Sequence, residues 1–130
     1  MIKVNVKKQS NYPVGTLKIK KHLAKFLKDK GIVSEAEVSL ALVGKEKMIS
    51  LARQYMGEVS TIPHNVLSFT ADESKGKFVY PPDGTLYLGD IIVCYPKALE
   101  EAKREDKLIE EKGLELIEHG ASHLLGEKHE

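Results

Sequence analysis

The chain has 130 residues, of which 42% are hydrophobic, and its 20 lysines and arginines nearly balance 19 aspartates and glutamates. This length suits one domain with a hydrophobic core, so we expect residues 1–130 to form a single domain. The net charge of +1 gives no indication of a strongly acidic or strongly basic binding partner. No apolar run is long enough to predict a transmembrane helix.

Charge is unevenly distributed along the chain. Residues 1–30 hold nine lysines against one aspartate, whereas residues 97–130 hold ten acids against six bases. The basic end suits contact with a phosphate backbone, although a solvated lysine-rich helix face explains it slightly better. The single cysteine, Cys94, cannot form an internal disulfide, which fits a reducing cytoplasm, and we expect it to be a small buried residue.

Hydrophobic periodicity predicts alternating strands and helices in the first half of the chain. Ile2, Val4 and Val6 alternate with polar residues, which is the period of two expected for a strand. From about Thr16, the apolar residues recur at the spacing of a helix. The predicted elements are a strand at 2–7, a helix from Thr16 to Gly31, a strand at 36–43, a helix at 45–56 and a strand at 65–69. Gly31 and Gly57 are the expected helix stops.

The second half begins with a polar, glycine- and proline-rich segment at 71–84, which predicts an exposed loop. Residues 85–94 have the longest apolar strand pattern, so we expect the central strand there. Pro96 opens a short helix, and a second helix runs from near Asp106 to about Leu125. This order predicts an α+β domain with a small mixed four-stranded sheet, helices packed against it, and a cleft beside an edge strand.

Asp90 lies inside the predicted central strand, where a carboxylate needs a partner. One interpretation is that it orients a metal-ligating histidine by accepting its second N–H group. The other is that it caps or pairs with nearby backbone, and we favour this structural role.

The C-terminal segment carries the strongest chemical signal in the sequence. His119 and His123 are four residues apart, a spacing that places two side chains on one helix face. Gly126 suits a left-handed helix end, after which His129 can supply a third nitrogen. Three protein ligands leave one position for water, which is typical of a catalytic zinc. The alternative is that these histidines are exposed or capping residues.

The three histidines and the glycine match the zinc-protease pattern H-E-x-x-H-x-x-G-x-x-H, with one departure. Gly120 occupies the position of the glutamate that acts as general base. Glu118 is a poor substitute, because it points about 100° away from His119 around the helix. The pattern therefore predicts the ligand set of a metal site without the proteolytic base.

The same segment, His119-Gly120 through His129, is similar to the signature of the YbeY endoribonucleases, which are ribosomal RNA maturation factors. Asn65-Val66-Leu67-Ser68-Phe69 resembles the family's T-[DN]-V-L-S-F strand, and Leu88-Gly89-Asp90-Ile91 resembles its L-G-D-I strand. The three segments occur in family order, and the resemblance covers about residues 35–129. It implies a zincin-like fold with the metal site on the C-terminal helix and tail.

The segment before the second motif departs from the family pattern. Met56 stands where the family has an arginine that is thought to serve catalysis, the loop that follows is two residues longer, and His64 replaces a threonine. An arginine can hold a phosphate with two hydrogen bonds, which a methionine cannot do. Arg53, one helical turn earlier, is the natural substitute, and His64 is a candidate base or phosphate contact. The alternatives are that Arg53 points to water and that His64 is an ordinary turn residue.

The resemblance implies a zinc-dependent, single-strand-specific endoribonuclease in ribosomal RNA maturation and ribosome quality control. His119, His123 and His129 would hold one Zn²⁺, with Arg53 and His64 as catalytic residues. The expected partners are ribosomal RNA in the small subunit, and ribosomal proteins or an assembly GTPase, in the cytoplasm. The alternative is a catalytically weakened metal-binding assembly or RNA-binding factor, which Met56 favours. Gly120 weighs against a third interpretation, a peptide hydrolase.

Overall fold

The computed structural model of the protein describes residues 1–71, 73 and 85–126. Its elements are β1 (Ile2–Lys8), α1 (Thr16–Asp29), β2 (Ala36–Val43), α2 (Lys45–Met56), β3 (Val66–Thr70), β4 (Leu86–Cys94), α3 (Tyr95–Arg104) and α4 (Ile109–Leu124). This order confirms the predicted one. The predicted loop at 71–84 lies almost entirely outside the described residues. Among those residues, no helix is both long enough and apolar enough to cross a lipid bilayer.

The predicted start of the last helix was wrong by about one turn. We expected it near Asp106, but α4 begins at Ile109. Asp106 adopts a left-handed backbone conformation with φ of 56°, and the N–H group of Lys107 donates to the carbonyl of Ala102 at 2.8 Å. This turn closes α3 before the next helix begins, since α-helical geometry cannot continue through a left-handed residue.

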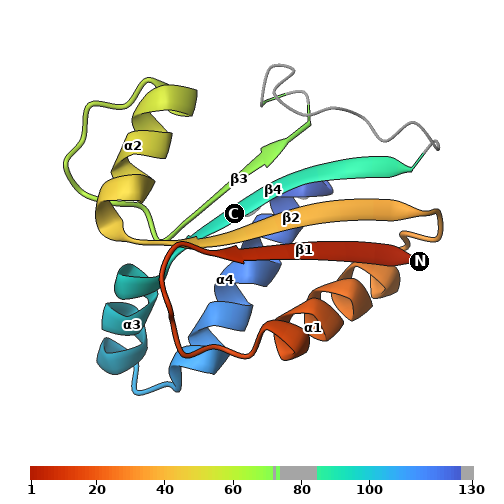
Figure 1. Ribbon diagram of the computed structural model, residues 1–130, viewed down its shortest axis with the longest axis horizontal. Helices are drawn as coiled ribbons and strands as arrows, with labels where there is room; N and C mark the ends of the chain where they lie inside the picture. Colours follow the sequence, from red (N-terminus) through yellow and green to blue (C-terminus); the bar gives the residue numbers. More distant parts are fainter. Residues whose placement is uncertain (72, 74–84, 127–130) are drawn as a thin grey trace.

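The four strands form one mixed sheet in the order β1-β2-β4-β3. β1, β2 and β4 are parallel, whereas β3 pairs antiparallel with β4. Figure 1 shows α1, α3 and α4 on one side of the sheet and α2 on the other. The sheet confirms the prediction that residues 85–94 form an interior strand, and β3 is an edge strand among the described residues.

Two hydrophobic clusters hold these layers together. The larger lies between the sheet and α1 and α4; its fully buried side chains include Leu23, Leu27, Val38, Leu40, Ile91 and Ile117. The smaller lies under α2 and contains Val43, Met48, Ala52, Leu67, Phe69, Ile92 and Cys94. Cys94 is fully buried, as expected for a small apolar side chain. The alternation of inward residues along the strands follows from their period of two.

Two glycines allow α4, β3 and β4 to approach closely. Gly89 has a φ of 139°, and a Cβ atom there would lie 2.2 Å from the Phe69 carbonyl oxygen and 2.9 Å from Leu124 Cδ2. A Cβ at Gly120 would lie 2.8 Å from Ile91 Cγ2. Any side chain at either position would push these elements apart, so the glycines set the distance between the last helix and the edge strand.

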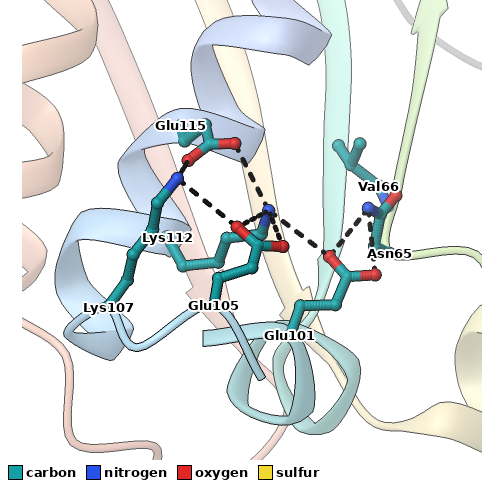
Figure 2. A network of polar contacts seen from close by, with 7 residues as sticks. All are labelled: Asn65, Val66, Glu101, Glu105, Lys107, Lys112 and Glu115. Atoms are coloured by element: carbon teal, nitrogen blue, oxygen red, sulfur yellow. Dashed lines mark hydrogen bonds and ion pairs between the residues drawn. The ribbon is translucent and has the colours of Figure 1, made fainter. Parts of the chain in front are cut away.

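A buried lysine ties α4 to α3 and to the start of β3, as Figure 2 shows. Lys112 is only 5% exposed, and its Nζ atom lies 3.0 Å from Glu105 Oε2 and 3.3 Å from Glu115 Oε1. It also lies 3.7 Å from Glu101, whose carboxylate accepts a 3.0 Å hydrogen bond from the amide of Asn65. Burial opposes its charge, but the hydrogen bonds to Glu105 and Glu115 raise the pKa of Lys112 above its usual value.

We expect Lys112→Met to destabilise the protein by about 3 kcal/mol, because the largely buried Glu101 would lose its cation, while Glu105 and Glu115 would keep only Lys107. Urea unfolding followed by circular dichroism would measure the loss. Lys107→Met is the matched control, since Lys107 is more exposed and pairs with the same Glu115; we expect it to cost at most about 1 kcal/mol. Equal stability of the two variants would show that the buried network contributes little.

Candidate metal-binding cleft

A cleft of about 480 Å³ runs beside the edge strand β3. Its described walls come from β3, from the end of α2, from α4 and from the turn after β3. The lining residues are Tyr55, Met56, Val66, Leu67, Ser68, Phe69, Glu73, His119, Gly120 and His123. The position of this cleft agrees with the prediction of a cleft beside an edge strand.

His119 and His123 lie on successive turns at the C-terminal end of α4, and both line the cleft. The opposite face of the same helix is buried in the core through Ile117 and Ala121, so the support of the pair is stiff. Gly126 follows with a φ of 78°, which confirms the predicted left-handed helix end. His129 lies outside the described residues, and among those residues no three potential ligands converge on one point.

Glu73 is a cleft residue that sequence reasoning missed. Its Oε1 atom lies 3.2 Å from His123 Nε2 and accepts a 2.8 Å hydrogen bond from the backbone N–H of Thr70. The Thr70 hydroxyl in turn accepts the Glu73 N–H at 3.2 Å. This reciprocal pair has the Thr-x-x-Glu spacing of a capping box, which was the available sequence signal. Although burial opposes it, the hydrogen bonds from Thr70 and His123 lower the pKa of Glu73.

The donor chemistry of the cleft suits a zinc ion. Two imidazoles on one helix face are common zinc ligands, and a carboxylate beside one of them can fix the orientation of its ring. Among the described residues that line the cleft, none is a lysine or an arginine. The described lining of this cleft therefore contributes no lysine or arginine that would repel a metal ion held by His119 and His123.

Packing explains why a glycine stands where the zinc-protease pattern has a glutamate. Position 120 faces β4, and a Cβ atom there would meet Ile91 at 2.8 Å. Glu118, the neighbouring acid, is turned toward α1, where its Oε2 atom lies 2.5 Å from His22 Nε2. This confirms that Glu118 does not replace the missing glutamate. The carboxylate that reaches the cleft comes instead from Glu73.

The residues predicted to contact the phosphate are not among the described residues that line the cleft. Met56 lines the cleft, whereas neither Arg53 nor His64 is among the residues lining it. Arg53 lies exposed in the last turn of α2. Nε2 of His64 lies 2.7 Å from Glu58 Oε1, so His64 has a carboxylate partner outside the cleft. The catalytic roles of Arg53 and His64 stay predictions.

Asp90 lies on the face of β4 that points away from α4. Its neighbour Ile91 contacts α4, and consecutive residues of a strand point to opposite faces. Asp90 Oδ1 accepts a 3.1 Å hydrogen bond from the Tyr87 hydroxyl, while Oδ2 is buried without a hydrogen-bond partner in the described part of the chain. This geometry supports the structural role rather than contact with a ligand histidine. Burial raises the pKa of Asp90 to about 6, and the Tyr87 hydrogen bond offsets part of the effect.

Asp90→Asn is expected to increase stability at pH 7. A carboxyl whose pKa is raised by folding destabilises the protein once it is ionised, so the penalty grows as pH rises from about 4 to about 6 and is absent below that range. The full penalty would be about 3 kcal/mol, which partial solvent screening reduces to about 1–2 kcal/mol. Urea unfolding at pH 4 and pH 7 would measure it, with the exposed Asp29→Asn as the control. If Asp90→Asn raised the free energy of unfolding equally at both pH values, the expectation would be contradicted.

The fold and the cleft together define a class of protein: a small α+β domain with a histidine pair on a core helix beside an edge strand. A solved protein from Thermotoga maritima, determined in solution, shares this fold with a TM-score of 0.57 and 24% sequence identity. The match covers 98% of this chain and 75% of the other.

The sequence profile of a family described as Endoribonuclease YbeY matches residues 4–130. An Endoribonuclease YbeY from Acinetobacter baumannii (strain ATCC 17978) is 35% identical over 112 residues, covering 86% of this chain and 68% of that protein. Another, from Roseiflexus castenholzii, is 29% identical over 130 residues, covering 100% of this chain and 80% of that protein. The chain therefore belongs to the YbeY endoribonuclease family.

Proposed function

We propose that the protein is a zinc-dependent, single-strand-specific endoribonuclease that acts in ribosomal RNA maturation and ribosome quality control in the cytoplasm. The observation that carries this proposal is the pair His119 and His123, which a stiff core helix presents to a cleft beside an edge strand. Family membership supplies the class of reaction. The proposed partners are ribosomal RNA in the small subunit, and ribosomal proteins or an assembly GTPase.

His119 and His123, together with the predicted third ligand His129, would hold one zinc ion. When bound, zinc would polarise a phosphoryl oxygen and lower the pKa of a water molecule. Glu73 lies 3.2 Å from Nε2 of His123, so it would hold this ring while Nδ1 bound the zinc, and the backbone N–H of Thr70 holds Glu73 in turn. The chain thus orients a ligand from two directions, by the helix and by the turn after β3.

The phosphate of the substrate would need a positively charged group near the cleft. Arg53 is one turn before Met56 on α2 and exposed, so its long side chain is a candidate for this contact. We propose Arg53 as the phosphate contact and His64 as a second candidate. The variants Arg53→Gln and His64→Gln would show which of the two residues contacts the phosphate. Loss of a group that acts only in the transition state lowers kcat with little change in KM.

The test of the proposed function is cleavage of a labelled single-stranded RNA by the purified protein, with its metal content measured in parallel. We expect about one zinc per chain, cleavage that is lost on treatment with a chelator, and recovery when zinc is restored. A hairpin of the same composition should be cleaved much more slowly. Metal-loaded protein that leaves single-stranded RNA intact would contradict the enzymatic proposal.

A second candidate function has a specific observation in its favour. Met56 lines the cleft at the family's arginine position, and its side chain cannot donate the hydrogen bonds with which an arginine would hold a phosphate. A protein that keeps its metal but binds ribosomal RNA without cutting it would fit this cleft. Protein that binds ribosomes and zinc but has no nuclease activity would favour this alternative.

Met56→Arg should raise kcat/KM for RNA cleavage by about tenfold or more, because an arginine there would place a bidentate donor inside the cleft. Met56 is half exposed, at 50%, so the longer side chain has room and the fold should not change. Met56→Gln is the control for polarity without charge and should leave kcat nearly unchanged. An unchanged rate for Met56→Arg would show that phosphate contacts are supplied elsewhere.

A further inference from the structure

The connection from α2 to β3 presents a cluster of exposed apolar side chains. Met56, Val59 and Ile62 are 50%, 87% and 69% exposed, and we call these three residues the apolar strip. Eight large hydrophobic side chains are exposed in the described part of the chain, and three of them fall within these seven positions. Exposed apolar residues this close together in the sequence mark the connection as a candidate binding surface.

Hydrogen bonds hold this connection in one conformation. Nε2 of His64 lies 2.7 Å and 3.0 Å from the two carboxylate oxygens of Glu58, which joins the start of the connection to its end. Inside this closed loop, the hydroxyl of Ser60 accepts a 3.0 Å hydrogen bond from the backbone N–H of Ile62. The apolar side chains are therefore displayed on an anchored backbone, which reduces the entropy lost when they bind a partner.

The apolar strip is continuous with the cleft. Met56, where α2 ends, and Val66, where β3 begins, both line the cleft, so the connection between them starts and finishes at its wall. Figure 1 shows this connection as the yellow-green segment that joins α2 to β3. A strand of substrate that leaves the cleft on this side would meet the apolar strip.

Charge decides which part of an RNA strand would face this surface. Between Met56 and Val66 the sequence contains no lysine or arginine, and Glu58 is its one carboxylate. A phosphate backbone gains nothing from such a surface and is repelled by the carboxylate. Unpaired nucleobases, in contrast, offer flat apolar faces, and these can pack against uncharged apolar side chains, although aromatic side chains are their usual partners.

We infer that the apolar strip is a subsite for unpaired nucleobases of the RNA strand that occupies the cleft, and that His64 positions this strip by closing the loop through Glu58. The inference rests on the proposed endoribonuclease function and adds a physical basis for its preference for single strands. Bases within a duplex are stacked on one another and cannot turn their faces to the strip.

The experiment compares binding of two oligonucleotides to the zinc-loaded protein by fluorescence anisotropy. One is a single-stranded RNA with a non-cleavable linkage, and the other has the same backbone with abasic sites. Val59→Ser/Ile62→Ser should weaken binding of the intact RNA by about tenfold while leaving the abasic strand unaffected. Val33→Ser is the matched control, since Val33 is 91% exposed and outside the apolar strip. Val59→Ser alone should give a smaller change of the same kind.

Each result bears on the inference separately from the proposed function. Unchanged binding in the double variant, or equal loss for both oligonucleotides, would overturn the inference while wild-type cleavage upheld the function. Normal RNA binding with loss of binding to a purified ribosomal protein would identify the strip as a protein interface and would also overturn it. Wild-type protein that neither binds nor cleaves the RNA would overturn both.

Glu58, the partner of His64, provides a second test with a kinetic signature. Glu58→Ala should raise KM for single-stranded RNA with kcat retained, because the loop would open while the cleft remained intact. Glu58→Gln should recover much of the wild-type KM, since its amide oxygen can still accept a hydrogen bond from His64 Nε2. A fall in kcat at unchanged KM would instead assign the contact between Glu58 and His64 to the chemical step and would overturn its positioning role.

Discussion

His123→Ala is expected to remove the metal from the protein and to abolish RNA cleavage with it. The substitution deletes one imidazole of the pair on α4 and leaves too few described donors for a stable zinc site. We expect zinc affinity to fall by about 100-fold or more, since loss of even a residue that only supports a ligand costs about 10–100-fold. Metal analysis of the purified variant and titration against a competing chelator would measure the change.

His22→Ala is the matched control for this substitution. His22 also lies on a helix and contacts a carboxylate, but its partner is Glu118 and neither residue lines the cleft beside β3. We expect this control to retain zinc and activity. Unchanged zinc content in His123→Ala would refute the assignment of His123 as a ligand, whatever its effect on cleavage.

Gly89→Ala should be the most damaging single methyl group that could be added to the sheet. The new Cβ would lie 2.2 Å from the Phe69 carbonyl oxygen, and the backbone φ of 139° is itself strained for any residue with a side chain. We expect a loss of about 3–5 kcal/mol, which combines backbone strain with overpacking. Thermal and urea unfolding would measure it.

Gly113→Ala is the control for adding a methyl group to a glycine. Gly113 lies inside α4, and a Cβ there would have no other atom within 4 Å. Because alanine favours helix, we expect this variant to gain about 0.5–1 kcal/mol. If Gly89→Ala were as stable as this control, β3, β4 and α4 would have room to move apart, and the close packing around the cleft would not be a constraint.

Local sequence determines much of this fold. The alternation of Ile2, Val4 and Val6 and the periodicity of α1 and α2 predicted those elements to within about two residues. Gly57 and Gly126 were predicted as helix ends, and both have the left-handed backbone conformation that such ends require. These features could be predicted from the sequence because they depend on residues within one or two turns of each other. The start of α4 was misplaced because a left-handed Asp106 cannot be recognised from periodicity.

The candidate site also has features that depend on local sequence and features that depend on packing between distant segments. The spacing of His119 and His123 placed both on one helix face, and both line one cleft. The pairing of Asp90 with Tyr87, in contrast, depends on the packing of β4. The register between β2 and β4 shifts after Tyr87, and this irregularity interrupts the simple alternation of faces along the strand. The placement of Met56 rather than Arg53 in the cleft depends on how α2 packs on the sheet.

By itself, the sequence determined the order of the elements, the helix ends and a pair of histidines held one turn apart, because backbone geometry and side-chain period are local properties. Only the tertiary structure brought Glu73 to His123 and set Gly120 against Ile91. These contacts join residues that are distant along the chain, and they form only when α4 packs across β3 and β4. The physical reason is that a cleft is bounded by several elements, and its shape follows from their packing rather than from any one segment.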